Sequence, residues 1–231
     1  MISQQLPLPM TLSEETTFAN FYEGDQEAVV RALNASLNEA GERFIYLAGP
    51  TGVGKTHLLQ ACCHEFFNRQ RASMYVPLKM GLSPAVLQHL ETMPLVCVDD
   101  IPVIVGNAEW EEALLHFYNR ARDNGVLLIV SGNRVPTNLT CRLADLQSRL
   151  SWGLTFSLKE LTDTQKIHAL QQRAHDRGLE FPDEVGQFLL HHYPRHMPTL
   201  FQLLDKLDHA SFIAQRKLTV PFVKSTLGEV P

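Results

Sequence analysis

The chain has 231 residues, a formal net charge of −5 at pH 7 with histidine neutral, 45% hydrophobic residues and 19% charged residues. This composition is ordinary for a globular protein, and the length suits one α/β domain of about 150 residues with a smaller second domain. It excludes a strongly basic protein that grips duplex DNA, so any route to DNA would run through a partner. The N-terminus resembles no signal peptide, and no run of about 18 apolar residues occurs. We therefore expect a cytoplasmic protein without a membrane span.

The chain begins with an apolar tail. Residues 1–12 carry Pro7 and Pro9, which disfavour a helix and favour an extended conformation. Two interpretations stay open on these residues alone. The tail packs on the domain as an edge, or it enters the groove of a partner protein.

A loop rich in aromatic residues follows at residues 16–24, and Asp25 is predicted to cap a helix that runs to about Ala40. Phe21 and Tyr22 in this loop are candidates for the wall of an adenine pocket. The alternative is that both are core aromatic residues.

The segment from Gly49 to Thr56 matches the phosphate-loop pattern G-x-x-x-x-G-K-[ST]. An apolar strand at residues 44–48 precedes it and an apolar periodic helix at residues 57–67 follows it, which is the context that this motif requires. Backbone N–H groups and the start of the helix would bind a polyphosphate, Lys55 would reach the β and γ phosphates, and the Thr56 hydroxyl would bind Mg²⁺. An empty glycine-rich turn is the weaker alternative. The predicted nucleotide-binding residues are Gly49, Pro50, Thr51, Gly52, Val53, Gly54, Lys55, Thr56 and His57.

Two carboxylates close the next buried strand. A short strand is predicted at residues 74–77 and a short helix at 83–91, after which four apolar residues at 95–98 lead into Asp99 and Asp100. In phosphate-loop NTPases the first acid at this position belongs to the coordination shell of Mg²⁺, and the second lies near the attacking water. Asp99 is therefore the Mg²⁺ candidate and Asp100 the candidate general base. A solvated turn is the alternative.

A further strand is predicted at residues 126–131, after a helix at 108–124. Asn133 follows this strand at a place level with the γ phosphate, so it is a candidate for orienting the lytic water, although Asn after Gly is also common in turns. A helix at 142–150 and a last strand at 153–158 complete the pattern. Alternation of strands and helices predicts a parallel sheet covered by helices.

From Thr162 onward only helices are predicted, at residues 162–177, 182–192, 199–215 and 220–227. We therefore expect an α/β domain over residues 13–159 and a small all-α domain over 160–231. The cysteines show no C-x-x-C pairing and are interpreted as small buried side chains in a reducing compartment: Cys62, Cys63, Cys97 and Cys141. Three clustered histidines are interpreted as surface or helix-end residues rather than as a metal site: His191, His192 and His196.

With these features on the chain, the sequence resembles the AAA+ ATPases and, more narrowly, the Hda family of shortened relatives of the bacterial replication initiator DnaA. The likeness covers nearly the whole chain and includes residues 75–78, 95–99, 146–153 and 214–224. It implies an AAA+ phosphate-loop NTPase domain with a helical C-terminal lid. It also matches Arg149 to the arginine finger that completes a neighbouring subunit's ATP site, whereas a lone surface arginine would form only a weak ion pair.

The resemblance also interprets the N-terminal tail. The segment Gln5-Leu6-Pro7-Leu8-Pro9 is similar to the family's peptide for the DNA polymerase III β sliding clamp. Gln5, Leu6 and Leu8 are therefore the predicted partner-binding residues. Prolines that stiffen such a segment reduce the entropy lost on docking.

The implied function is negative regulation of replication initiation. With the DNA-loaded clamp, such a protein stimulates hydrolysis of the ATP bound to DnaA. The implied partners are DnaA, the clamp, DNA indirectly through the clamp, and further copies of the chain. The implied cofactors are Mg²⁺ and ADP or ATP, with the diphosphate favoured, since Pro198 stands where family members commonly have the sensor 2 arginine and Arg195 lies close by but out of register. We expect weak intrinsic ATPase activity. The alternative is a self-sufficient AAA+ ATPase or loader that remodels a replication partner.

Overall fold

The computed structural model describes residues 16–78 and 81–228. Within them the chain forms two compact units. The first contains residues 16–21 and 26–158, and the second contains residues 22–25 and 159–228. The tail predicted at residues 1–12 lies outside the described residues.

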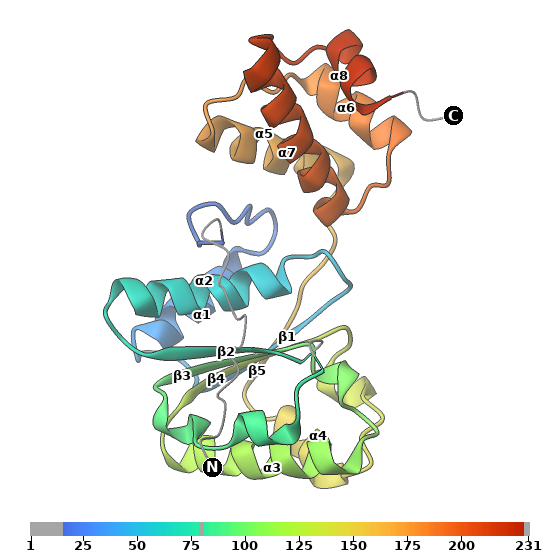
Figure 1. Ribbon diagram of the computed structural model, residues 1–231. Helices are drawn as coiled ribbons and strands as arrows, with labels where there is room; N and C mark the ends of the chain where they lie inside the picture. The colour runs from blue at the N-terminus through green and yellow to red at the C-terminus, as the bar shows by residue number, and fades with distance from the viewer. Residues whose placement is uncertain (1–15, 79–80, 229–231) are drawn as a thin grey trace, which may run out of the picture. The chain divides into compact units, whose positions relative to one another are not determined.

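A five-stranded parallel sheet forms the centre of the first unit (Figure 1). Its strands, in chain order, are β1 (Phe44–Ala48), β2 (Ser73–Pro77), β3 (Leu95–Asp99), β4 (Leu127–Gly132) and β5 (Leu154–Ser157). Their order across the sheet is β2-β3-β4-β1-β5. All strands run in one direction, so the residues that follow β1, β3 and β4 meet at one edge of the sheet, as predicted from the alternating pattern.

Helices cover both faces of this sheet. Figure 1 shows α1 (Glu27–Leu37) and α2 (Lys55–Asn68) on one face, and α3 (Ala108–Asp123) and α4 (Ala144–Leu150) on the other. The strand β1 has buried residues throughout, and they alternate between the two apolar cores. Burial on both faces explains why the central strands read as continuous apolar runs in the sequence.

Some element boundaries differ from the predictions. Residues 83–91 form two 3₁₀ helices, η2 (Pro84–Leu87) and η3 (Leu90–Thr92), rather than one helix, because Gln88 is extended and His89 is left-handed with φ of 62°. This break allows both Leu87 and Leu90 to enter the core on the side of α3. The helix α1 begins two residues after Asp25, and Gln26 occupies its N-cap position without a side-chain cap. Two more 3₁₀ turns are η4 (Ile101–Val103) and η5 (Pro136–Asn138).

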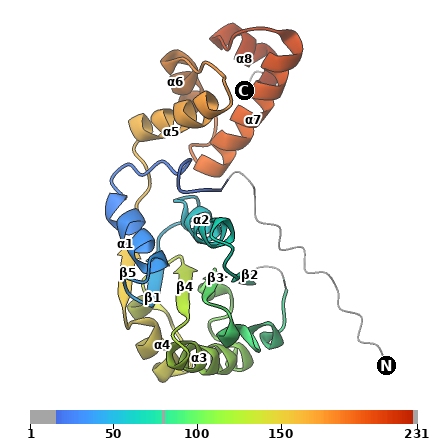
Figure 2. The ribbon, with the colours of Figure 1, turned by 90° about the vertical axis from the view of Figure 1, so that its left-hand side faces the viewer.

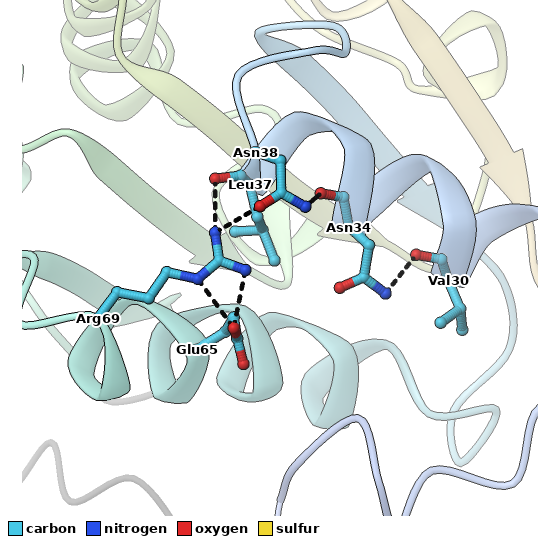
Figure 3. A network of polar contacts seen from close by, with 6 residues as sticks. All are labelled: Val30, Asn34, Leu37, Asn38, Glu65 and Arg69. Atoms are coloured by element: carbon cyan, nitrogen blue, oxygen red, sulfur yellow. Dashed lines mark hydrogen bonds and ion pairs between the residues drawn. The ribbon is translucent and has the colours of Figure 1, made fainter.

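Arg69 joins the C-terminal ends of α1 and α2 (Figure 3). Its guanidinium donates to Leu37 O at 3.1 Å and to Asn38 Oδ1 at 2.9 Å, and its Nε donates to Glu65 Oε1 at 2.8 Å. The carbonyl groups in the last turn of a helix have no intrahelical partner and attract cations. Arg69 therefore stabilises the end of α1 and its packing against α2.

Four helices form the second unit, and Figure 2 shows them as one small bundle. They are α5 (Asp163–Asp176), α6 (Asp183–His192), α7 (Met197–Ala214) and α8 (Val220–Leu227). A capping box between Thr162 and Gln165 begins α5. Arg195 belongs to this bundle, where its Nη1 lies 2.9 Å from Asp163 Oδ2 and its Nε donates to Leu190 O.

Cysteine burial follows the prediction for three of the four residues. Cys62, Cys63 and Cys97 are buried, whereas Cys141 is only half-buried, and burial raises the pKa of its thiol to about 11. Across residues 16–78 and 81–228, no cluster of three or more histidine, cysteine or acidic side chains could hold a metal. The described helices include none with the length and apolar character needed to cross a bilayer.

Candidate functional site

The predicted phosphate loop connects β1 directly to α2. Gly54 stands at the N-cap of α2 with φ of 98°, a conformation that residues with a Cβ rarely adopt. A Cβ at Gly54 would also lie only 2.6 Å from Cε2 of Phe21, and a Cβ at Gly49 only 2.6 Å from Leu158 O. Both positions therefore require glycine for packing as well as for backbone conformation.

Lys55 is held inside the curve of this loop. Its Nζ donates to Gly49 O at 2.6 Å and to Pro50 O at 2.7 Å, and the residue is only 9% exposed. Because Lys55 is the first residue of α2, its positive charge adds to the positive end of the helix. The arrangement concentrates positive potential where a polyphosphate would meet the loop.

Asp99, at the end of β3, accepts hydrogen bonds from three different elements. Thr56 Oγ1 donates to Asp99 Oδ2 at 2.7 Å, the Tyr75 hydroxyl donates to the same oxygen at 2.8 Å, and Ser131 Oγ donates to Oδ1. Burial, and then the nearby Asp99 carboxylate, raises the pKa of the Tyr75 hydroxyl, so the phenol stays protonated and donates. The carboxylate is thus held rigidly against the first turn of α2.

Asp100 and Asn133 follow neighbouring strands at the same edge of the sheet. Asp100 is left-handed with φ of 73°, and its N–H donates to Ser131 Oγ at 2.9 Å. This turn directs the chain away from β3, and Asp100 remains half-buried. Asn133 lies one residue beyond β4 and is exposed. The sheet therefore brings the predicted general base and the predicted water-orienting residue to the edge where the phosphate loop begins.

The oxygen atoms of Thr56 and Asp99 fit the requirements of Mg²⁺. They lie 2.7 Å apart, and both are hard oxygen donors. Thr56 and Asp99 would therefore hold the ion, which usually keeps several of its waters in proteins.

Residues 16–21 lie against the start of α2. His57 Nε2 is 2.8 Å from Thr17 O, and the Thr16 hydroxyl donates to Gln60 Oε1 at 2.8 Å. The ring of Phe21 is buried with its centroid 5.3 Å from that of His57. Phe21 thus packs directly on the phosphate loop, whereas Tyr22 packs with the helical core of the second unit. The two adjacent aromatic residues belong to different units.

Arg149 occupies the last turn of α4, far from the phosphate loop of its own chain. The helix leads through Gly153 into β5, and a Cβ at Gly153 would lie 2.5 Å from Phe44 O at the start of β1. The phosphate loop follows Ala48 at the other end of β1. At about 3.3 Å per strand residue, these two ends are about 13 Å apart.

Sequence reasoning missed two residues of the Asp99 site, Tyr75 and Ser131. The sequence predicts a strand at each of them but indicates no role for either side chain. The register of the sheet holds the missing signal, because Val98 pairs with Val130 and the next residues on each strand are Asp99 and Ser131. Ser131 lies near the end of a strand that runs beside the strand of Asp99. Its contact with Asp99 could therefore have been predicted from the pairing of these two strands.

The chain has a phosphate loop beside a strand that ends in an acid, on a parallel sheet of order β2-β3-β4-β1-β5, and a helical lid follows in the sequence. These features define a phosphate-loop NTPase fold of the AAA+ class. The family model for the bacterial DnaA ATPase domain matches residues 12–80 and 84–157, and the model for the Hda lid domain matches residues 163–227. The chain therefore belongs to the DnaA-related AAA+ family and carries an Hda-type lid, as the motifs predicted.

Solved structures agree with this assignment at the level of the fold. Domain III of the Thermotoga maritima replication initiation protein DnaA is 20% identical, with a TM-score of 0.79 over 94% of this chain and 97% of that one. AMPPCP-bound DnaA from Aquifex aeolicus is 21% identical, with a TM-score of 0.70 over 89% of this chain and 74% of that one. The Thermotoga maritima RuvB branch migration motor is 17% identical, with a TM-score of 0.66 over 87% and 67% of the two chains.

Proposed function

We propose that this protein is a negative regulator of replication initiation, which supplies Arg149 in trans to the ATP site of DnaA and thereby stimulates ATP hydrolysis there. In this proposal the protein acts in the cytoplasm on the DNA-loaded sliding clamp. The observation that carries the proposal is the place of Arg149. It lies at the edge of the sheet opposite its own phosphate loop, so its charge cannot serve the nucleotide of its own chain.

Charge at this position has a definite chemical use. In the transition state of phosphoryl transfer, negative charge spreads over the oxygens of the transferred group, and a positioned guanidinium stabilises it. A finger supplied in trans accelerates hydrolysis by about 10³ to 10⁵, equivalent to roughly 4 to 7 kcal/mol of barrier. Arginine suits this task better than lysine because its planar fork donates two hydrogen bonds together.

We further propose that the chain binds ADP or ATP with Mg²⁺ at its own phosphate loop. Lys55 and the backbone N–H groups of the loop would hold the phosphates, and Thr56 and Asp99 would hold Mg²⁺, which neutralises phosphate charge when bound. Asp100 is a short candidate base and Asn133 a candidate for orienting water. Pro198 offers no cation to the γ phosphate, so we expect retention of the diphosphate and slow intrinsic hydrolysis.

The proposed route to DNA is indirect. Gln5, Leu6 and Leu8 of the N-terminal tail would enter pockets of the clamp, and a clamp that encircles DNA would concentrate the regulator near DnaA. Self-association of the chain is also part of the proposal, since AAA+ sites are commonly completed by neighbouring copies. A formal net charge of −5 fits this indirect route better than direct binding to DNA.

The deciding experiment measures loss of ATP from preloaded DnaA in the presence of DNA-loaded clamp. We expect the protein to accelerate this loss, and we expect Arg149→Ala and Arg149→Lys to abolish the acceleration while binding clamp and nucleotide normally. Arg122→Ala is the matched control, since Arg122 is an exposed arginine on the same face of the sheet. Acceleration that survives in Arg149→Ala would contradict the trans role.

A separate experiment tests the tail. Replacing Gln5, Leu6 and Leu8 with alanine should weaken clamp binding by about a hundredfold or more, because two buried leucines contribute on the order of 3 kcal/mol. Met10→Ala is the control, since it changes an apolar residue of the same tail outside the motif. Titration of labelled clamp gives both affinities, and unchanged affinity of the triple variant would rule out this docking segment.

A further inference from the structure

Arg149 lies on the ring of Trp152. The guanidinium carbon is 4.4 Å from the centroid of the Trp152 ring, and the backbone N–H of Trp152 donates to Arg149 O at 3.1 Å. The arginine side chain is 22% exposed, although it belongs to a surface helix, whereas Trp152 is 49% exposed. A cation over an indole face is the strongest form of the cation–π contact.

The polar contacts of the guanidinium within the described residues are weak. Among the described residues, Arg149 Nε is buried without a hydrogen-bond partner, and its ion pair with Asp145 Oδ1 is long at 3.6 Å. Asp145 is itself largely exposed, so solvent screens that attraction. The ring of Trp152 therefore supports one face of the planar group, and no short ion pair within the described part of the chain competes with it.

The turn that carries Trp152 is well anchored. Ser151 Oγ and N–H both donate to Gln147 O, at 2.8 and 3.1 Å, which closes the end of α4. Gly153 then adopts φ of 79° and packs on Phe44 at the start of β1. Trp152 itself belongs to none of the apolar cores formed by the described residues, so core packing does not explain a half-exposed tryptophan here.

We propose that Trp152 is a positioning residue that presents Arg149 to the nucleotide site of the partner. This inference rests on the proposed function. A free arginine side chain samples many rotamers and loses that freedom when it enters a site. The stack restricts the rotamers beforehand, so less entropy is lost as the guanidinium meets the transferring phosphoryl group. Trp152 therefore affects the hydrolysis rate through Arg149 and does not touch the phosphates.

The first test compares Trp152→Ala with Trp152→Phe in the DnaA-ATP assay with loaded clamp. Trp152→Ala should lower the maximal rate of ATP loss roughly fivefold, about the effect expected from one exposed cation–π contact, while the concentration for half-maximal effect stays unchanged. Trp152→Phe should restore part of the rate. A normal maximal rate in Trp152→Ala, with or without a higher half-maximal concentration, would overturn the inference.

This assay separates the two proposals. Failure of the unmodified protein to accelerate ATP loss would contradict the proposed function, whereas normal acceleration by both the unmodified protein and Trp152→Ala would contradict only the role of Trp152. Thermal melts of each variant identify any loss of folding. Trp152→Phe retains an aromatic ring and can be compared if Trp152→Ala proves unstable.

The second test requires no partner. Ring currents from Trp152 should shift the side-chain NMR resonances of Arg149 to high field, and Trp152→Ala should return them to ordinary positions. Arg122 is the internal control, because it lies on α3 and pairs with Asp123. Unshifted Arg149 resonances in the unmodified protein would overturn the presentation of Arg149 by Trp152.

Discussion

Thr56 Oγ1 donates a hydrogen bond of 2.7 Å to Asp99 Oδ2, which joins the first turn of α2 to the end of β3. Since Ser131 and Tyr75 donate to the same carboxylate, Asp99 acts as the common acceptor for three elements of the first unit. One buried carboxylate thus links the stability of the nucleotide site to the packing of the sheet.

Asp99→Asn should weaken this arrangement. An amide has one oxygen acceptor, so its NH₂ group would face either the Ser131 hydroxyl or the Thr56 and Tyr75 hydroxyls, which would have to rotate and accept instead of donating. We expect the free energy of unfolding to fall by about 1 to 3 kcal/mol and the dependence of nucleotide affinity on Mg²⁺ to shrink. Calorimetric titration with and without Mg²⁺ measures the second effect. Asp123→Asn, an exposed change on α3, is the control. Equal Mg²⁺ dependence of nucleotide affinity in both variants would show that Asp99 does not contribute to Mg²⁺ binding.

Lys55→Ala should reduce nucleotide affinity about 10- to 150-fold, because hydrogen bonds to a charged group contribute about 1.5 to 3 kcal/mol. The ammonium is bound by two carbonyl groups of the loop, and its contact with Gly49 O is buried, so a thermal melt should accompany the titration. Lys206→Ala on α7 removes the same charge from an exposed helix position and serves as the control. Titration of a fluorescent ADP analogue measures each affinity, and near-normal binding by Lys55→Ala would contradict the assignment of the loop.

Local sequence predicted the phosphate loop and the strands because their signals are contiguous. Glycines, a lysine and an apolar strand follow one another between Phe44 and Thr56, so no long-range information is needed. The contacts of Tyr75 and Ser131 with Asp99 depend instead on sheet register, which joins residues 24 and 32 positions away. The break at His89 was also missed, because burial of leucines on both sides of it, rather than local propensity, sets that turn.

Glu111 has a structural role that its sequence did not indicate. This fully buried carboxylate, on the first turn of α3, accepts from the backbone N–H groups of Gly106 at 2.6 Å, Arg142 at 3.1 Å and Leu143 at 2.8 Å. Burial acts to raise the pKa of Glu111, but the three hydrogen bonds outweigh it, and the pKa lies below the ordinary value. Glu111 thereby holds the segment that leads into α4, the helix of Arg149.

Glu111→Gln should lower the free energy of unfolding by about 1 to 3 kcal/mol at pH 7, since its NH₂ group would oppose a backbone donor. A depressed pKa in the folded protein means that the carboxylate stabilises it fully above the unfolded pKa of about 4.3, and that this contribution is lost as the pH falls through the folded pKa. The difference in stability between the unmodified protein and the Glu111→Gln variant should therefore shrink below about pH 4.3.

Urea unfolding of both proteins between pH 7 and pH 3 measures this difference. Glu112→Gln is a matched control, because Glu112 is the next residue on α3 and its side chain is 69% exposed. We expect Glu112→Gln to change stability by less than about 0.5 kcal/mol at any pH in this range. A constant difference for Glu111→Gln across the whole range would show that its charge contributes nothing.

Tyr46→Phe should leave stability unchanged or raise it by about 1 kcal/mol. The Tyr46 side chain is fully buried in β1, and its hydroxyl has no hydrogen-bond partner among the described residues. Burial raises the pKa of this hydroxyl, so it remains neutral and simply lacks the hydrogen bonds that water would give it. Removing an unsatisfied buried polar group while keeping the ring removes that cost and creates almost no cavity.

A second substitution tests the same packing from the opposite side. A Cβ added at Gly132 would collide with the Tyr46 hydroxyl, and it would also lie 3.3 Å from Cδ of Pro102. Gly132→Ala should therefore destabilise the protein, and the loss should be smaller in a Tyr46→Phe background because the hydroxyl is gone. Urea unfolding followed by tryptophan fluorescence measures this double-mutant cycle, since both tryptophans lie in the same unit as Tyr46. Equal losses of stability in the two backgrounds would show that space at Gly132 is limited by atoms other than the Tyr46 hydroxyl. A large loss for Tyr46→Phe alone would show that the hydroxyl has a hydrogen-bond partner.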